Sequence, residues 1–261
     1  MFKQRFMTLT LLVFFSLSLF ALPISAQDDD HEGEPPHWEY EGEAGPENWG
    51  DLSEDFALCG MGTAQSPIDI SGASALNLTD IAFAYADSAL NIFNNGHTIQ
   101  VNVDEGSSIS YNGISYDLLQ FHFHHPSEHV VDGVPADMEI HFVHRDPNSG
   151  NLAVVGVLLM AGEEANAEYA AVFDHLPAEV GEADAMGNSV DVASLIPADA
   201  HYTTYNGSLT TPPCSEIVRW LVLDTPVTLS AEQIEAFAAI HEMNARPVQP
   251  LNGRDLLEDN E

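Results

Sequence analysis

The chain has 261 residues, of which 45% are apolar, 41 are Asp or Glu and only six are Lys or Arg. This length suits one large domain with a sizeable core, and the apolar share excludes a chain that is disordered throughout. The net charge of −35 repels nucleic acid and anionic lipid, so we expect neither as a partner. Such an acidic surface fits either a saline habitat or a general need for solubility.

The first 26 residues have the layout of a secretory signal peptide. Lys3 and Arg5 precede an apolar run over residues 6–22, and a proline and small residues follow at 23–26. We expect cleavage near Ala26, because the polar residues within the run disfavour the alternative of a retained membrane anchor. Cleavage removes two positive charges, which takes the net charge to about −37. We therefore expect an exported protein, periplasmic or secreted, that does not contact the membrane after cleavage.

The remaining chain divides into tails and one domain. We expect a mobile acidic tail at 27–36, a single domain at 37–257 and a C-terminal tail at 258–261. The chain's two cysteines, Cys59 and Cys214, both fall within the domain. Export into an oxidising compartment favours one disulfide over the alternative of two separate buried thiols.

Short β-prone runs separated by turn residues dominate the chain after residue 68. Strands are predicted at 90–93, 98–103, 108–111, 118–124, 138–143 and 152–160. The turn signals between them are Asn94-Asn95-Gly96, Asn112-Gly113 and Asp132-Gly133. Helices are predicted at 165–176 and at 231–243, where Ser230 and Gln233 can form a capping box. The pattern indicates a β-rich α+β domain around a large, twisted, mostly antiparallel central sheet with a few short peripheral helices.

Histidines on two of these strands form the most informative pattern in the sequence. Side chains alternate between the faces of a strand, so Gln120, His122 and His124 share one face. Leu119, Phe121 and Phe123 share the other face, which we expect in the core. The next predicted strand places Glu139 and His141 on one face.

If these two strands pair, three imidazoles meet at one point. Three histidines with an open fourth position are typical of catalytic zinc, and Gln120 and Glu139 are placed to orient the rings beside them. The alternative is a strand of ordinary polar-face histidines. Five other histidines do not share this geometry and are expected to be structural or at the surface: His125, His144, His175, His201 and His241.

Several further blocks accompany the histidine strand. They are Gly45-Pro46-x-x-Trp49, Gln65-Ser66-Pro67-Ile68-Asp69-Ile70, Asn94-Asn95-Gly96-His97, Ser127-Glu128-His129, Gly207-Ser208-Leu209-Thr210-Thr211-Pro212-Pro213-Cys214 and Asn244-x-Arg246-Pro247-x-Gln249-Pro250-Leu251. With these blocks, residues 37 to 257 resemble the α-class carbonic anhydrases, in particular the exported bacterial type.

The resemblance implies an enzyme that reversibly hydrates carbon dioxide to bicarbonate and a proton through a zinc-bound hydroxide. Zn²⁺ would be held by His122, His124 and His141. Thr210 would accept a hydrogen bond from the hydroxide and donate its own to Glu128. The small-molecule substrate would be the only partner, apart from a second copy if the protein is a homodimer rather than a monomer.

The resemblance also implies roles around the centre. His97 would shuttle protons, and Tyr40 and Asn95 would hold the water chain on the proton path. The residues orienting the metal ligands would be Gln120, Glu139 and Asn244. The carbon dioxide pocket would be lined by Val143, Val154, Leu209, Thr211 and Trp220. Cys59 and Cys214 would form the single disulfide.

Three rival functions are open at this point. A catalytically inactive relative that acts as a binding module would lack a metal ligand, whereas this chain has all three. A zinc-dependent ester hydrolase would need a substrate groove that the sequence does not indicate, although side activity on esters fits the same chemistry. A structural zinc protein would need four protein ligands rather than three.

Overall fold

The computed structural model describes residues 36–183 and 185–260, so the predicted signal peptide and nearly all of the predicted acidic tail lie outside the described residues. Residues from Pro36 onward form one compact unit. No helix in this described part has the length and hydropathy needed to cross a membrane.

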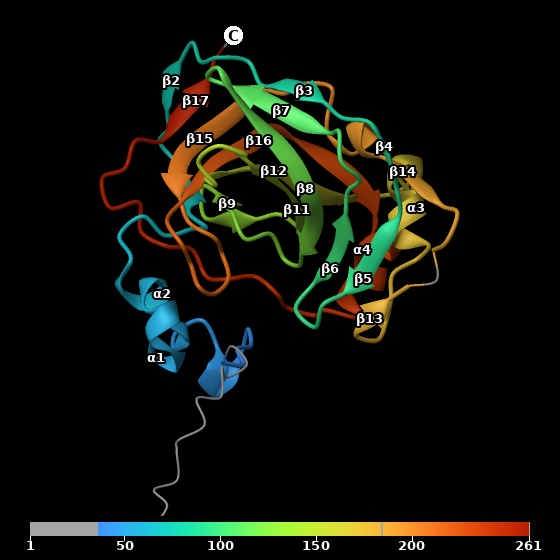
Figure 1. Ribbon diagram of the computed structural model, residues 1–261, viewed down its shortest axis with the longest axis horizontal. Helices are drawn as coiled ribbons and strands as arrows, with labels where there is room; N and C mark the ends of the chain where they lie inside the picture. The colour runs from blue at the N-terminus through green and yellow to red at the C-terminus, as the bar shows by residue number, and fades with distance from the viewer. Residues whose placement is uncertain (1–35, 184, 261) are drawn as a thin grey trace, which may run out of the picture. The chain divides into compact units, whose positions relative to one another are not determined.

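Seventeen strands and a few short helices make up the described chain (Figure 1). The strands are β1 Asp69–Ile70, β2 Ser74–Leu76, β3 Ala82–Ala84, β4 Asp87–Ala89, β5 Asn91–Asn94, β6 Ile99–Asn102, β7 Ser108–Tyr111, β8 Ile114–His124, β9 Val130–Val131, β10 Val134–Pro135, β11 Met138–Arg145, β12 Leu152–Gly162, β13 Gly181–Glu182, β14 Ser189–Asp191, β15 Tyr202–Gly207, β16 Val218–Ser230 and β17 Leu257–Asp259. The α-helices are α1 Trp49–Leu52, α2 Leu58–Met61, α3 Ala170–Phe173 and α4 Ala231–Ala238. The 3₁₀ turns are η1 Gly42–Ala44, η2 Glu54–Phe56, η3 Ala167–Tyr169 and η4 Val192–Leu195.

One large mixed sheet organises the domain. Its main path in the described residues is β13-β5-β6-β8-β11-β12-β16-β15-β17-β2, with β7 and β3 branching from β8. β12 pairs with β16 in parallel, as does β17 with β2, and the other pairings along the path are antiparallel. The expected large, mostly antiparallel sheet is confirmed.

The two faces of the central strands have opposite chemistry. Phe121 and Phe123 of β8 and Ile140 and Phe142 of β11 are fully buried in the main hydrophobic cluster, which also holds side chains of α3 and α4. Burying such side chains is the main source of stability, at about 25 cal/mol per Å² of apolar surface. The opposite face of the same strands carries the histidines, which are therefore displayed from a rigid, well-packed layer.

A β-bulge changes one detail of this alternation. Val143 lies opposite Gln120 while His144 lies opposite Leu118, so Leu119 has no partner residue on β11. Leu118 is buried in the main cluster, and Leu119 is only partly buried outside it. The expectation that Leu119 packs in the core was wrong, because an extra residue in one strand shifts the alternation.

Two of the predicted turns are present, but only one of them joins the strands expected from the sequence. Asn112 and Gly113 join β7 to β8 with φ of 50° and 78°, the left-handed values that a tight hairpin turn requires. Asp132 and Gly133 also adopt positive φ, but they join β9 to β10 in a separate three-stranded sheet rather than leading directly to β11.

The helices are shorter than expected, and the C-terminal residues are part of the sheet. The Ser230–Gln233 capping box is present, but α4 ends at Ala238 rather than continuing to residue 243. The region expected as a helix from 165 to 176 forms only η3 and α3. Residues 258 and 259, expected in a tail, belong to β17, because pairing with β15 and β2 holds them in the sheet.

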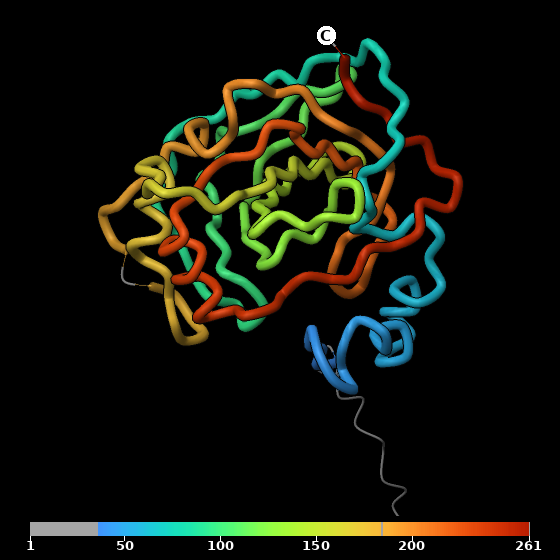
Figure 2. Tube along the Cα trace, turned by 180° about the vertical axis from the view of Figure 1, so that it is seen from behind, coloured from blue at the N-terminus to red at the C-terminus, as the bar shows by residue number. Residues whose placement is uncertain are grey.

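The N-terminal segment packs as an aromatic cluster. Trp49 is fully buried with Tyr40 and the two cysteines, and Trp38 packs against them. The segment that follows α4 returns past this cluster (Figure 2), where Arg246 donates a hydrogen bond to the carbonyl of Cys59. Two distant parts of the chain therefore meet beside the disulfide.

Candidate active site

The three predicted ligands meet on one face of the sheet. His141 of β11 lies directly opposite His122 of β8 in the antiparallel register, and His124 is two residues further along β8. Their ring centroids are 5.3 Å apart for His122 and His141, 5.0 Å for His122 and His124, and 4.6 Å for His124 and His141. One ring nitrogen from each lies within 4.8 Å of the others, close enough to share a metal ion.

Each ring is oriented by a partner at its other nitrogen. Nδ1 of His122 lies 2.9 Å from the amide oxygen of Gln120, and Nδ1 of His124 lies 2.7 Å from the backbone carbonyl of Asn244. Nε2 of His141 lies 2.9 Å from Oε1 of Glu139, at an angle that departs from a linear hydrogen bond. Nε2 of His122, Nε2 of His124 and Nδ1 of His141 remain for a metal ion.

The burial of these rings suits metal binding. Nε2 of His124 is a buried polar atom without a hydrogen-bond partner among the described residues, which an ion would satisfy. Burial lowers the pKa of His122 and of His124, so both rings are neutral donors near pH 7. Burial acts in the same direction on His141, but the carboxylates of Glu139 and Glu128 outweigh it and raise its pKa.

A neighbouring histidine that the sequence did not single out completes the orientation of Glu139. Nδ1 of His129 lies 2.8 Å from Oε1 of Glu139, and Nε2 of His129 lies 2.7 Å from the hydroxyl of Tyr205. The backbone N–H groups of Glu128 and His129 donate to Oε2 of Glu139. Burial opposes ionisation of Glu139, but the adjacent histidines outweigh it and hold its pKa well below the usual range. His129 lies between β8 and β9, where the alternation of side chains along a strand does not predict which way a residue faces.

Glu128 lies beside His124 and His141. Oε1 of Glu128 accepts a hydrogen bond of 2.9 Å from the backbone N–H of Arg246. Oε2 is buried, lies 3.5 Å from Nε2 of His124 and has no hydrogen-bond partner among the described residues. Thr210 is also buried, but no hydrogen bond joins its hydroxyl to Glu128 in the described structure. The role of this pair stays a prediction.

An apolar cluster borders the histidines. Val154 and Trp220 are buried in it, and Val143 and Leu209 pack against it. Val143 pairs with Val154 across β11 and β12, and Val154 pairs with Trp220 across β12 and β16. The Trp220 ring lies 4.8 Å from that of His141. Four of the five residues predicted for the pocket thus share one cluster, while the partly buried Thr211 is not among its members.

The expected proton path lies near a cavity of about 530 Å³. His97 and Tyr40 line this cavity, and the His97 ring stacks on Trp38 with centroids 3.7 Å apart and planes 9° apart. Burial lowers the pKa of His97 from its ordinary value. Asn95 is exposed, and its side-chain oxygen accepts hydrogen bonds from the N–H groups of His97 and Thr98. Asn95 therefore shapes the loop that carries His97.

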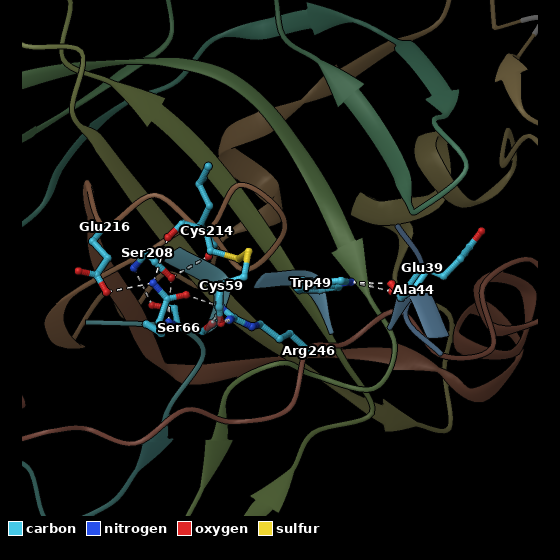
Figure 3. Close-up of a disulfide and its surroundings, with 11 residues drawn as sticks. Glu39, Ala44, Trp49, Cys59, Ser66, Ser208, Cys214, Glu216 and Arg246 are labelled. Carbon is cyan, nitrogen blue, oxygen red and sulfur yellow. Dashed lines mark hydrogen bonds between the residues drawn. A yellow bond between two sulfur atoms is a disulfide. The ribbon is translucent and has the colours of Figure 1, made fainter. Parts of the chain in front are cut away.

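The disulfide is present between Cys59 and Cys214, with an S–S distance of 2.07 Å and a sequence separation of 155 (Figure 3). Cys214 comes four residues after Thr210, so the bond ties the Thr210 loop to the N-terminal segment. The expectation of one disulfide rather than two free thiols is confirmed.

Comparisons with known proteins agree with this geometry. The family model described as eukaryotic-type carbonic anhydrase matches residues 44–260. A carbonic anhydrase from Pectobacterium atrosepticum is 42% identical over 238 residues, covering 91% of this chain and 97% of that protein. One from Nostoc sp. is 45% identical over 228 residues, covering 85% of this chain and 86% of that protein.

A solved structure extends the comparison to the fold. The α-carbonic anhydrase from Thermovibrio ammonificans, solved in complex with the inhibitor sulfanilamide, matches with a TM-score of 0.83 at 43% identity. The match covers 86% of this chain and 100% of the Thermovibrio ammonificans chain. The family model, the relatives and the histidine group lead to one conclusion. The chain belongs to the α-carbonic anhydrases, a family of zinc lyases whose reaction is the hydration of carbon dioxide.

Proposed function

We propose that this chain carries out the family reaction at a zinc ion held by His122, His124 and His141. The observation that carries the proposal is that each of the three rings is oriented by a partner and leaves one nitrogen directed to a common point. Three imidazole nitrogens with an open fourth position suit catalytic zinc. When bound, zinc in such a site is a Lewis acid that provides a nucleophile at neutral pH, a property established for carbonic anhydrases rather than calculated for this chain.

Thr210 and Glu128 orient the reacting groups in this proposal. The Thr210 hydroxyl accepts a hydrogen bond from the nucleophile and donates its own proton to Oε2 of Glu128. Supporting this role, Oε2 is buried beside His124 while Oε1 is held by a backbone N–H. A fixed acceptor costs no reorganisation when the reaction occurs, which is the main advantage of a preorganised site.

The apolar cluster holds the substrate. Carbon dioxide is small and uncharged, so it needs an apolar niche near the nucleophile and no cationic side chain. Val143, Val154, Leu209 and Trp220 supply such a niche beside His141, and Thr211 follows Leu209 by two residues in the chain. The strongly acidic surface does not impede a neutral substrate.

His97 moves the proton released in each cycle. Its partly buried ring lines the cavity together with Tyr40, which is buried close enough to Glu128 for that carboxylate to raise its pKa in addition to burial. An imidazole with a pKa near neutrality can accept and release a proton at working pH. Tyr40 and the Asn95 loop hold the path between the site and the ring.

The protein acts outside the cytoplasm in this proposal. The signal-like residues 1–26 and the disulfide support export, because such bonds persist in oxidising compartments. Its partner is the small substrate alone, and its assembly state is a monomer or a homodimer.

The experiment combines metal content with activity. Stopped-flow carbon dioxide hydration is measured on the purified protein before and after a chelator, alongside zinc per chain. His141→Ala should lose tight zinc binding and activity, whereas the exposed His201→Ala should keep both. Circular dichroism verifies that each variant is folded. A folded His141→Ala that retains one zinc and normal activity would contradict the proposed site.

A further inference from the structure

Arg246 is a buried cation whose guanidinium donates hydrogen bonds only to neutral acceptors. The residue is 2% exposed, and burial lowers the pKa of its guanidinium to about 10, although the Glu128 carboxylate acts in the opposite direction. Nη1 donates to the side-chain oxygen of Gln65 at 2.9 Å and to the carbonyl of Ser66 at 2.8 Å, while Nη2 donates to the carbonyl of Cys59 at 2.9 Å. The guanidinium also lies over the Trp49 ring (Figure 3). Burying a charge this way is costly, so the arrangement calls for an explanation.

The acceptors connect the guanidinium to both ends of the disulfide. Cys59 is contacted directly through its carbonyl. Cys214 is reached through Gln65, whose Nε2 donates to the Cys214 carbonyl at 3.0 Å while its oxygen accepts from Arg246. The guanidinium therefore joins the N-terminal segment to the loop that carries Thr210.

The backbone of the same residue contacts the catalytic region. The N–H of Arg246 donates to Oε1 of Glu128 at 2.9 Å, and Glu128 is 1% exposed. Two residues earlier, the carbonyl of Asn244 accepts from Nδ1 of His124. Residues 244–246 lie outside every helix and strand, so no ladder of sheet hydrogen bonds fixes their position. Asn244 is held by hydrogen bonds from its own backbone N–H to the carbonyl of His125 and from its amide to the carbonyls of His97 and Phe123. Two residues later, the side-chain hydrogen bonds of Arg246 come from its guanidinium.

We propose that Arg246 is a positioning residue for the hydration reaction: its guanidinium anchors residue 246 to both ends of the disulfide and so holds the Glu128 carboxylate through the backbone N–H. The inference rests on the proposed role of Glu128. The disulfide then does more than stabilise the fold, because it anchors the residue that positions Glu128. Arg246 itself does not touch the substrate.

The test compares two arginines. Arg246→Met removes the anchor, and Arg246→Lys keeps a charge without the planar fork that reaches several acceptors. Arg254→Lys is the matched control, since the Arg254 guanidinium also donates to backbone carbonyls and lies over the Tyr205 ring, but does not contact Glu128. Misplacing a catalytic group by about 1 Å costs up to roughly 100-fold, so we expect kcat/KM to fall roughly 10- to 100-fold in Arg246→Met.

The remaining readouts separate positioning from general destabilisation. Zinc should stay at one per chain in Arg246→Met, and Arg246→Lys should recover part of the lost kcat/KM. The control should lower the melting temperature and leave kcat/KM unchanged. If Arg246→Met does not fold, Arg246→Lys carries the comparison. Normal kcat/KM in a folded Arg246 variant would overturn the inference.

The double variant Arg246→Met, Glu128→Gln tests whether the loss of kcat/KM in Arg246→Met comes through Glu128. If Arg246 acts through Glu128, adding Arg246→Met to Glu128→Gln should cause little further loss of kcat/KM, because residues that act as a unit are not additive. Fully additive losses would refute that route. Wild-type activity in Glu128→Gln alone would instead refute the proposed role of Glu128, so the two failures are distinguishable.

Discussion

Removing the disulfide should lower the stability of the folded protein substantially. The perturbation is the double variant Cys59→Ala, Cys214→Ala, which deletes a cross-link between buried positions 155 residues apart. A cross-link restricts the unfolded chain, and the chain-entropy relation gives about 5 kcal/mol for a loop of this length. This is an upper figure, because residual structure in the unfolded chain reduces the entropy that the cross-link removes.

The expected change in melting temperature follows from the size of the domain. A domain of this size shifts by roughly 2–4 °C per kcal/mol, so the full effect corresponds to roughly 10–20 °C. Differential scanning calorimetry should be run with excess zinc, because a ligand that binds only the folded state raises the melting temperature by mass action. Reduced wild-type protein should approach the double variant.

Two controls complete the measurement. Reductant should not change the melting temperature of the double variant, which has no disulfide to break. Thiol titration should find no free thiols in the exported wild-type protein. A shift below about 2 °C between wild type and double variant would show that the loop-closure reasoning does not apply to this chain.

The other predictions concern catalysis and pH. Thr210→Ala should slow hydration by roughly 100-fold with unchanged zinc content, the scale of losing one positioned transition-state hydrogen bond, and wild-type speed would remove Thr210 from the mechanism. His97→Ala should lower kcat in weak buffer, keep kcat/KM and recover with added imidazole; a loss that no small buffer repairs would show another proton route. Burial lowers the pKa of His144 to about 3, so the folded state keeps it neutral while the unfolded state protonates it below about 6.5. Stability should therefore fall as pH drops from about 6.5 to 3, and urea unfolding should show a shallower fall in His144→Gln; equal slopes would contradict the linkage.

The histidine group was predictable because its residues lie on strands with regular alternation. His122, His124 and His141 follow from the side-chain period of two and from the pairing of neighbouring strands. The bulge at Leu119 was not predictable, because one extra residue does not change the pattern of a short apolar run in the sequence. The parallel pairing of β12 with β16 was also missed, because it joins strands far apart in the sequence.

Residues that act from loops were the least predictable. His129 orients Glu139 from the segment between β8 and β9, and Arg246 contacts Cys59 from 187 positions away. Such contacts depend on the completed fold rather than on any local period. The family motifs include both residues, but a motif alone does not say which atoms meet.

The orientation of the three proposed zinc ligands shows why these loops matter for the proposed reaction. Gln120 and Glu139 each lie beside a histidine two residues away on the same strand, so two of the three rings have their orienting partner within the sheet. The third ring, His124, is oriented by the carbonyl of Asn244, which lies 120 positions further along the chain. Asn244 is itself held by hydrogen bonds to the carbonyls of His125, His97 and Phe123, while the Arg246 guanidinium ties the next part of the segment to Cys59 of the disulfide. The rigid sheet thus carries the three histidines, whereas contacts from residues 244–246 orient the last ring and the Glu128 carboxylate beside it.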